Sequence, residues 1–272
     1  MENNRVIAHQ RKIREEMALT NPRESASTLD GYSVETISRN DAIPIIMHYE
    51  WLRTIGRSTI FVGLLSPLRE IEGVACFGWG PGGNIRRMIG VPALCLERGA
   101  CVHYAPQNAA SYLISMACKL VYRIHGVARF FAYADPMAGE YGAVYQAANW
   151  LYLGQGLDGG KGREKRWFVL APGRVGNKPE NWQTTRILRR QNPRLHLRNC
   201  EAAGWRKVKR GGKHVYAINV GRDRRRWRKE RLHAQKAVHG GYLAYPAPYP
   251  ELKRKRAKRV SFHICENKGG SP

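Results

Sequence analysis

The feature that most constrains this chain is a run of alternating patterns between residues 93 and 154. Two short apolar runs, at 93–102 and 127–134, are each followed by polar turn residues. Between them, up to residue 125, apolar residues recur at the three-and-four spacing of a buried helix face, and residues 142–153 show that spacing again. The pattern predicts strand, turn, helix, strand, turn, helix, which is typical of an α/β sheet.

Polar residues lie where these predicted strands end. Asp135 directly follows the strand at 127–134, and Asn108 and Ser111 begin the helix that follows the first strand. Ligands of α/β sheets bind at the carboxyl edge, so this is the expected place of a site. A helix start of this kind presents backbone N–H groups that suit a phosphate, although the same residues also form an ordinary helix cap. The pattern indicates a site but names no ligand.

The basic residues are concentrated in the second part of the chain. Residues 1–160 hold 15 Lys and Arg against 14 Asp and Glu, residues 161–262 hold 30 against 6, and residues 263–272 hold one of each. We call residues 161–262 the basic segment. Its charge matches a polyphosphate partner, because each contact with a phosphate releases condensed counterions. An ordinary solvated face would mix both signs, so the segment predicts binding to nucleic acid.

Four parts follow from these observations. We expect a flexible arm at residues 1–29, a core at 30–160, a basic and partly ordered continuation at 161–220, and a basic, largely extended or disordered tail at 221–272. The basic segment supplies the expected contacts with nucleic acid, at Arg189, Arg190, Lys207, Arg224, Arg225, Arg226, Lys253 and Arg254.

Cysteine spacing and hydropathy exclude several classes of protein. The six cysteines contain no C-x-x-C pair and no regular spacing with histidine, so neither a zinc module nor a disulfide framework is expected. The first thirty residues contain no apolar signal region, and no apolar run reaches the length of a membrane span. We therefore expect a cytoplasmic protein without a membrane partner and without a protein-bound metal site.

The first hundred residues predict further strands at 32–38, 58–65 and 71–77. A helix capped near Asn40 is expected to run to about Trp51, and His48 lies near its end. A histidine in that place is more often a partner of the helix dipole than a catalyst.

This order of elements resembles the GNAT acyltransferase superfamily. A narrower resemblance, from about residue 32 to 220, is to the Mom DNA-modification proteins of phage Mu and its relatives. Several motifs in the same order carry it: His48-Tyr49, Leu96-Glu97-Arg98, Ala105-Pro-Gln-Asn-Ala-Ala-Ser111, Tyr133-Ala-Asp-Pro136, Gly139, and the stretch from Tyr145 to Gly154.

The resemblance implies a fold and an activity. The fold is α/β (α+β), a GNAT-like mixed central sheet flanked by helices, here with a basic C-terminal extension. Members of the family convert adenine in DNA into a carbamoylmethylated adenine, which shields phage DNA from restriction enzymes. The expected partner is therefore double-stranded DNA.

Matched motif by motif, the resemblance also implies site residues. It assigns catalysis to Asp135, His48, Tyr49 and Ser111, donor binding to Arg98, Asn108 and Ser111, and substrate contacts to Tyr133, Tyr141, Tyr145 and Asn149. After Glu97-Arg98 the family continues with apolar residues, whereas Gly99-Ala100-Cys101 follows here. The resemblance therefore does not define the surroundings of Arg98. The competing interpretation makes Asp135 a turn cap and Tyr133 and Tyr145 core aromatics.

The chemistry constrains these roles. An adenine amine is a poor nucleophile, so an enzyme must accept its proton, and the base must first leave the duplex. Asp135 suits a group that orients the amine or accepts its proton, and His48 or Tyr49 suits the acid toward the leaving group. The aromatic residues that could stack on the extruded base are Tyr49, Trp51, Trp79, Tyr141 and Trp150.

The donor stays open at this point. A glycyl group transferred from glycyl-tRNA and then rearranged would give the product and make tRNA a second partner. Acyl coenzyme A, with or without iron, is the alternative. Two other classes of protein also fit: a non-catalytic nucleic-acid-binding protein on the same scaffold, and a coenzyme A-dependent acetyltransferase.

Overall fold

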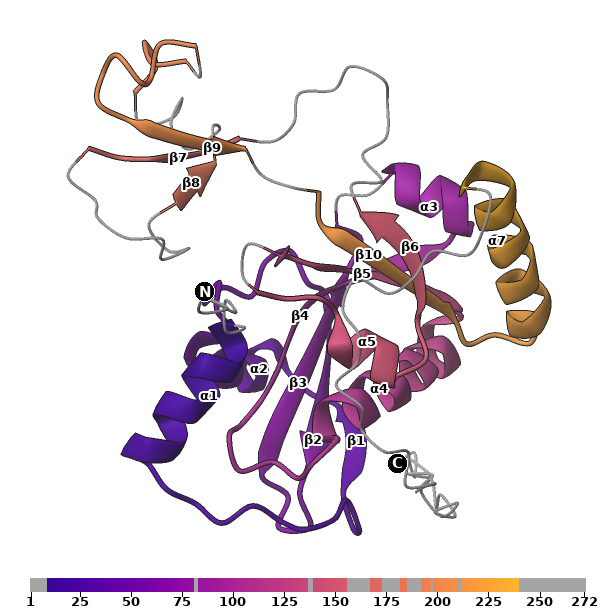
Figure 1. Ribbon diagram of the computed structural model, residues 1–272. Coiled ribbons are helices and arrows are strands. Elements are labelled where there is room, and N and C mark those ends of the chain that lie inside the picture. Colours follow the sequence, from indigo (N-terminus) through magenta and orange to yellow (C-terminus); the bar gives the residue numbers. More distant parts are fainter. Residues whose placement is uncertain are drawn as a thin grey trace, which may run out of the picture.

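The computed structural model describes residues 9–80, 83–136, 139–155, 167–172, 182–184, 192–196, 198–209 and 212–239. In these residues the chain forms a seven-stranded central sheet and a second sheet of three strands (Figure 1). The helices are α1 His9–Thr20, α2 Arg39–Tyr49, α3 Gly83–Ile89, α4 Ala109–His125, α5 Ala143–Ala147 and α7 Arg224–His239.

The central sheet has the order β1-β2-β3-β4-β5-β10-β6. Its strands are β1 Ser33–Thr36, β2 Ile60–Leu65, β3 Ile71–Gly78, β4 Ala93–Cys101, β5 Arg129–Ala134, β6 Leu151–Gln155 and β10 His214–Asn219. All neighbours pair antiparallel except β4 and β5, which are parallel and are joined through α4. The sheet thus confirms the predicted mixed α/β fold with flanking helices.

The second sheet has the order β8-β7-β9 and contains β7 Trp167–Leu170, β8 Trp182–Thr184 and β9 Arg206–Lys209. It has a small apolar cluster of its own, made of Val169, Cys200 and Trp205. The last strand of the basic segment, β10, instead joins the central sheet between β5 and β6.

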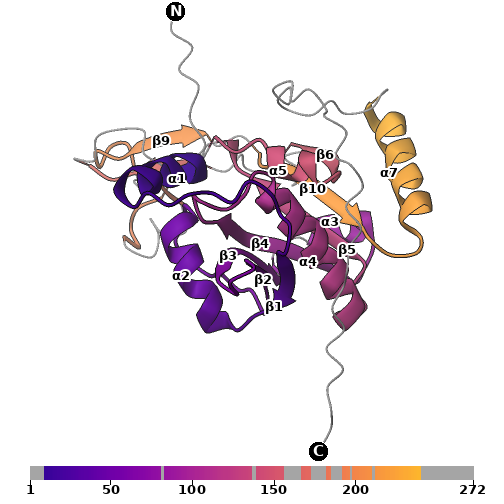
Figure 2. The same cartoon turned by 90° about the horizontal axis from the view of Figure 1, so that it is seen from below.

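The two faces of the central sheet carry different helices. Along β4, Leu94 belongs to the large cluster that also contains Ala117 of α4, while Cys95 belongs to a second cluster with Ile89 of α3 and Trp227 of α7. Successive side chains of a strand point to opposite faces, so α4 covers one face of β4, and α3 and α7 cover the other. Figure 2 shows α1 and α2 at one end of the molecule and α7 at the other.

Helix α2 begins two residues earlier than a cap at Asn40 would place it. Ser38 is the cap: its hydroxyl accepts a hydrogen bond from the backbone N–H of Asp41 at 3.1 Å, and the Asp41 carboxylate accepts one from the backbone N–H of Ser38 at 3.2 Å. This capping box fixes the direction of the helix. The helix ends at Tyr49. Glu50 follows as its C-cap, and the Glu50 side chain lies near Arg98 of the central sheet.

The predicted helix at 142–153 is wrong in its second half. Only α5 is helical there, and β6 follows from Leu151. Trp150 and Tyr152 belong to the large cluster, whereas Leu151 and Leu153 belong to the second one. This alternation between two buried faces has a period of two, which identifies a central strand, and buried strands carry continuous apolar runs that mimic a helix.

A helix lies within each of the two end regions that were expected to lack regular structure, while residues 1–8 and 240–272 lie outside the described residues. Residues 1–29 were expected to be a flexible arm, but α1 is a helix whose Ile13 and Met17 pack against the large cluster. Residues 221–272 were expected to be extended or disordered, but α7 is a helix of 16 residues with Trp227 buried against the sheet. Among the described helices, none has the length and apolar character needed to cross a membrane.

Candidate active site

The site arises where two parallel strands separate. The pairing of β4 with β5 runs from Ala93 opposite Arg129 to Leu96 opposite Ala132. Beyond this point β4 continues beside β3, and β5 continues beside β10. The carboxyl halves of the two strands therefore diverge, and the side chains that follow Leu96 and Ala132 face an opening.

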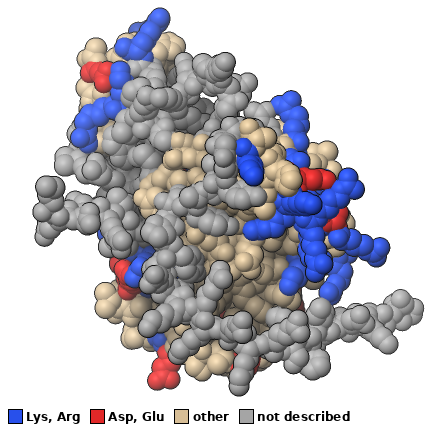
Figure 3. All heavy atoms as spheres, turned by 45° about the vertical axis from the view of Figure 1, so that its right-hand side comes forward, with Lys and Arg blue, Asp and Glu red and all other residues tan. Residues whose placement is uncertain are grey.

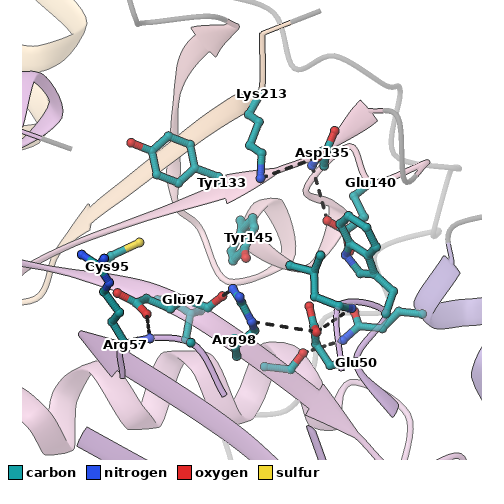
Figure 4. A pocket seen from close by; sticks show the side chains of 16 residues that line it. Glu50, Arg57, Cys95, Glu97, Arg98, Tyr133, Asp135, Glu140, Tyr145 and Lys213 are labelled. Atoms are coloured by element: carbon teal, nitrogen blue, oxygen red, sulfur yellow. Dashed lines mark hydrogen bonds and ion pairs between the residues drawn. The ribbon is translucent and has the colours of Figure 1, made fainter. Parts of the chain in front are cut away.

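A pocket of about 320 Å³ occupies this opening (Figure 4). The end of α2, strand β4, the end of β5, helix α5 and the residue before β10 all contribute to its lining. Its ionisable lining residues are the acids Glu50, Glu97, Asp135 and Glu140, the cations Arg57, Arg98 and Lys213, and Cys95, Tyr133 and Tyr145. The pocket therefore combines several proton acceptors with several cations.

Glu50 and Arg98 form one side of the pocket. The Glu50 carboxylate accepts a hydrogen bond from the backbone N–H of Leu52 at 2.7 Å and lies 4.0 Å from Nε of Arg98. Arg98 also donates to the backbone oxygen of Thr54 at 2.7 Å, which fixes the guanidinium group. Burial raises the pKa of Glu50 to about 6, although Arg98 opposes this shift.

Asp135, Lys213 and Glu140 form the opposite side. Asp135 is 3% exposed, and its carboxylate lies 3.6 Å from Nζ of Lys213. The backbone N–H of Asp135 donates to the Glu140 carboxylate at 3.4 Å, and the Trp51 side chain is hydrogen-bonded to the same carboxylate. In Figure 4, Tyr145 lies between this group and the pair of Glu50 and Arg98.

Glu140 has a carboxyl group whose pKa is strongly raised. The pKa of Glu140 is raised to about 7, mainly by burial and also by the negative charge of Glu50, while Lys213 opposes the shift. A carboxyl group with such a pKa exchanges its proton near neutral pH, as general acid–base catalysis requires. Asp135 is paired with Lys213 and is instead suited to hold and orient a bound ligand.

Glu97 is held by the loops around it. One oxygen, Oε2, accepts hydrogen bonds from the backbone N–H of Arg57 at 3.0 Å and from the Ser58 hydroxyl at 3.4 Å. The other, Oε1, is buried without a hydrogen-bond partner among the described residues. A Cβ atom at Gly80 would lie 2.5 Å from that oxygen, so glycine at this position is needed for the backbone to approach the carboxylate so closely.

The turn before α5 depends on another glycine. Gly142 has φ +76°, and a Cβ there would lie 2.2 Å from the ring of Tyr216. The Tyr216 hydroxyl donates to the backbone oxygen of Tyr141 at 2.5 Å, and its ring packs 5.2 Å from that of Tyr145. Burial raises the pKa of Tyr145. The turn thus positions Tyr145 in the pocket as a neutral phenol.

Four of the predicted site residues meet in this pocket: Arg98, Tyr133, Asp135 and Tyr145. His48 does not line it. The His48 ring is exposed, and its Nδ1 lies 2.8 Å from the backbone oxygen of Pro44 in the same helix. His48 therefore does not share the pocket with Asp135, whereas Arg98 does.

The other predicted catalytic and donor-binding residues also lie outside the pocket lining. Tyr49 is buried in the core, with its hydroxyl 2.9 Å from Nδ1 of His103. The Ser111 hydroxyl donates to the backbone oxygen of Asn108 at 3.0 Å, so it serves the local helix start. Asn108 itself has a left-handed backbone with φ 67° and makes no side-chain cap.

Tyr141 and Asn149, the remaining predicted substrate contacts, are likewise not part of the lining. Tyr141 is 40% exposed, and the backbone oxygen of Asn149 accepts a hydrogen bond from Arg228 at 3.1 Å. Of the aromatic residues considered for stacking, Tyr49 and Trp150 are buried in the core. Trp51 lines the pocket, while Trp79 and Tyr141 are exposed.

Sequence reasoning missed Glu50, Glu140 and Lys213. Glu50 directly follows the His48-Tyr49 motif, so its signal was proximity to a motif. Glu140 and Lys213 are 73 residues apart in sequence and reach the pocket through the β5–β10 pairing, in which Ala134 lies opposite His214. No local sequence pattern predicts that β5 pairs with β10.

The predicted nucleic-acid contacts are distributed over the chain. Arg224, Arg225 and Arg226 are exposed on α7, and Lys207 on β9 forms an ion pair with Glu201. Arg189, Arg190, Lys253 and Arg254 lie outside the described residues. In the part of the chain that the structure describes, no three His, Cys, Asp or Glu residues are grouped to hold a metal ion.

The fold and the pocket define a mixed α/β protein with an acid–base site where two parallel strands of its central sheet diverge. The model of the Mom protein family matches residues 31–235 of the 272. The chain therefore belongs to the Mom protein family. No curated protein matches the sequence.

Three solved structures show a partial likeness. A ribosomal-protein-S5-alanine acetyltransferase from Vibrio fischeri has 8% identity and a TM-score of 0.38, covering 72% of this chain and 96% of its own. A putative phosphinothricin N-acetyltransferase has 8% identity and a TM-score of 0.34, with coverages of 70% and 99%. A putative acetyltransferase from Sphaerobacter thermophilus DSM 20745 has 8% identity and a TM-score of 0.32, with coverages of 71% and 96%. Because these TM-scores lie below 0.5, the description of the fold rests on the sheet order of this chain alone.

Proposed function

We propose that this protein is a transferase that converts adenine in double-stranded DNA to a carbamoylmethyl adenine, a modification that protects phage DNA from restriction. Membership of the Mom family and the order of the motifs support this proposal. The observation that carries it is the pocket, in which Glu140, Asp135 and Arg98 surround a space at the divergence of β4 and β5. The charge of the basic segment supports a nucleic-acid substrate.

Glu140 is the proton acceptor in this proposal. The exocyclic amine of adenine becomes a nucleophile only when its proton is removed, and a carboxylate with a pKa near neutrality does this best. Asp135, held by Lys213, is the hydrogen-bond acceptor that orients the amine. Arg98, anchored on Thr54 and Glu50, faces the negative charge that develops on the carbonyl oxygen during transfer.

The donor that fits best is a glycyl ester, carried on tRNA. Its ammonium group is attracted by a pocket that contains four carboxyl side chains against three cations. The adenine amine attacks the glycyl carbonyl carbon, the ester C–O bond breaks, and the tRNA hydroxyl leaves with the proton. The glycyl amine then attacks the ring carbon, and the original exocyclic nitrogen is expelled into the new amide. The alternative donor is an acyl coenzyme A.

Mass spectrometry of nucleosides tests the proposal. DNA from cells that express the protein should contain an adenine derivative with the mass of a carbamoylmethyl adduct, and DNA from cells that express Glu140→Gln should lack it or contain far less. Unmodified DNA from cells that contain soluble, folded wild-type protein would overturn the proposal. The non-catalytic nucleic-acid-binding alternative predicts that result.

A further inference from the structure

Helix α7 is fixed to the central sheet along one face. The Trp227 indole is buried, and its N–H donates to the backbone oxygen of Ile89 in α3 at 2.8 Å. Two turns later, the Gln235 side chain donates to the backbone oxygen of Tyr152 in β6 at 2.5 Å, and Arg231 between them donates to a backbone oxygen of α3. Spacings of four residues place all three on one side of the helix. The helix is therefore held in a defined orientation.

The opposite face of α7 is cationic. The helix contains seven Lys and Arg against a single Glu, and this Glu230 pairs with Arg226 at 2.8 Å. At about 100° per residue, Arg225, Lys229 and Lys236 project away from the buried face. All three are exposed, and among the described residues none of them is joined to an acid by an ion pair. Figure 3 shows Lys and Arg side chains gathered on this side of the molecule.

The pocket borders the apolar cluster against which α7 packs. Cys95 lines the pocket and belongs to the same apolar cluster as Trp227 of α7. The 16 residues of α7 make a helix about 24 Å long, which matches about seven base pairs of duplex. A duplex bound along α7 can therefore contact the helix over about seven base pairs.

We propose that the outward face of α7, defined by Arg225, Lys229 and Lys236, is the docking surface for the phosphate backbone of double-stranded DNA. This inference rests on the proposed function, in which DNA is the substrate. Gln235 is buried, so α7 offers no outward amide of the kind that reads adenine in the major groove. The outward cations then position the duplex through its phosphates.

A pair of matched double variants tests this surface. Arg225→Gln/Lys229→Gln removes one Arg and one Lys from α7, and Lys119→Gln/Arg123→Gln removes the same types and charge from exposed positions on α4. Affinity for a short DNA duplex is measured by fluorescence anisotropy between roughly 50 and 200 mM salt. The α7 variant should bind about tenfold more weakly with a salt slope smaller by about 2, while the α4 variant should bind like wild type.

Three outcomes would overturn the inference: an unchanged salt slope in the α7 variant, an equal loss in both double variants, or a loss confined to a tRNA probe. Circular dichroism checks that both variants fold, which is expected because all four side chains are exposed. If wild-type protein modifies DNA but the α7 variant keeps its salt slope, the inference alone fails. If wild-type protein neither binds nor modifies duplex DNA, the proposed function fails as well.

Discussion

Glu140 shows how burial and neighbouring charges together set the pKa of one residue. Lys213 and Arg98 favour its ionised form, whereas burial and the charge of Glu50 favour the protonated form. Burial has the largest effect, so the pKa of Glu140 rises to about 7 in spite of the two cations. The same burial acts on Glu50, whose pKa rises to about 6. The pocket thus retains two carboxyl groups that change charge close to neutral pH.

The first prediction concerns the activity of Glu140→Gln. The glutamine keeps the size of the side chain but cannot accept a proton, so we expect kcat to fall by about 100-fold or more. In the wild type, kcat should rise with pH through about 7 as Glu140 becomes ionised, and this rise should be absent from the residual activity of the variant. Glu15→Gln, an exposed Glu on α1, is the matched control and should leave the profile unchanged.

The same variant has a predictable effect on stability. The pKa of Glu140 is raised in the folded state, so the protonated carboxyl group stabilises the fold at low pH, and this contribution is lost as pH rises through about 7. Glutamine never ionises. The Tm of Glu140→Gln relative to wild type should therefore be higher at pH 8 than at pH 5, as differential scanning calorimetry can measure. A difference that does not depend on pH would contradict the assigned pKa shift.

At the scale of elements, α7 depends on Trp227. Trp227→Ala removes a buried aromatic ring and its hydrogen bond to Ile89, and should lower the free energy of unfolding by about 3 kcal/mol. Trp227→Phe keeps most of the packing but leaves that backbone oxygen without its donor, so its cost should be about 1 kcal/mol. Chemical denaturation measures both. Equal costs would mean that packing of the ring contributes little to holding the helix.

The elements that the sequence predicted correctly are those with local signals. The strands near 93–102 and 127–134 and the helix between them are confirmed as β4, β5 and α4. The errors at β6 and α7 have tertiary causes. β6 is buried on both faces, so its apolar run had no polar alternation to reveal a strand. In α7, Trp227 is the one large aromatic among many cations, and its importance appears only once α3 is known to lie beside it.

At the scale of the whole molecule, the site was predictable only in part. Asp135 was found because it directly follows a predicted strand, and Arg98 was found through the Leu96-Glu97-Arg98 motif of the family resemblance. Lys213 was not found, because β10 enters the sheet between β5 and β6 after a long excursion through the second sheet. The basic segment is therefore part of the pocket as well as of the charged surface, since it supplies the lysine that pairs with Asp135.

That dual role bears on the donor, which is the subject of the last prediction. If a glycyl group is transferred and then rearranged, the exocyclic nitrogen of adenine ends in the terminal amide of the product. DNA that carries heavy nitrogen at this amine, incubated with purified protein and glycyl-tRNA, should yield a product whose label fragments away with the amide. Label retained on the ring-attached nitrogen would contradict the rearrangement and indicate direct alkylation. Ribonuclease treatment of a crude extract should abolish activity. Activity that persists without tRNA and depends on a coenzyme A thioester would instead assign the cations of the pocket to an acyl coenzyme A. The exposed cations of the basic segment would then bind DNA alone.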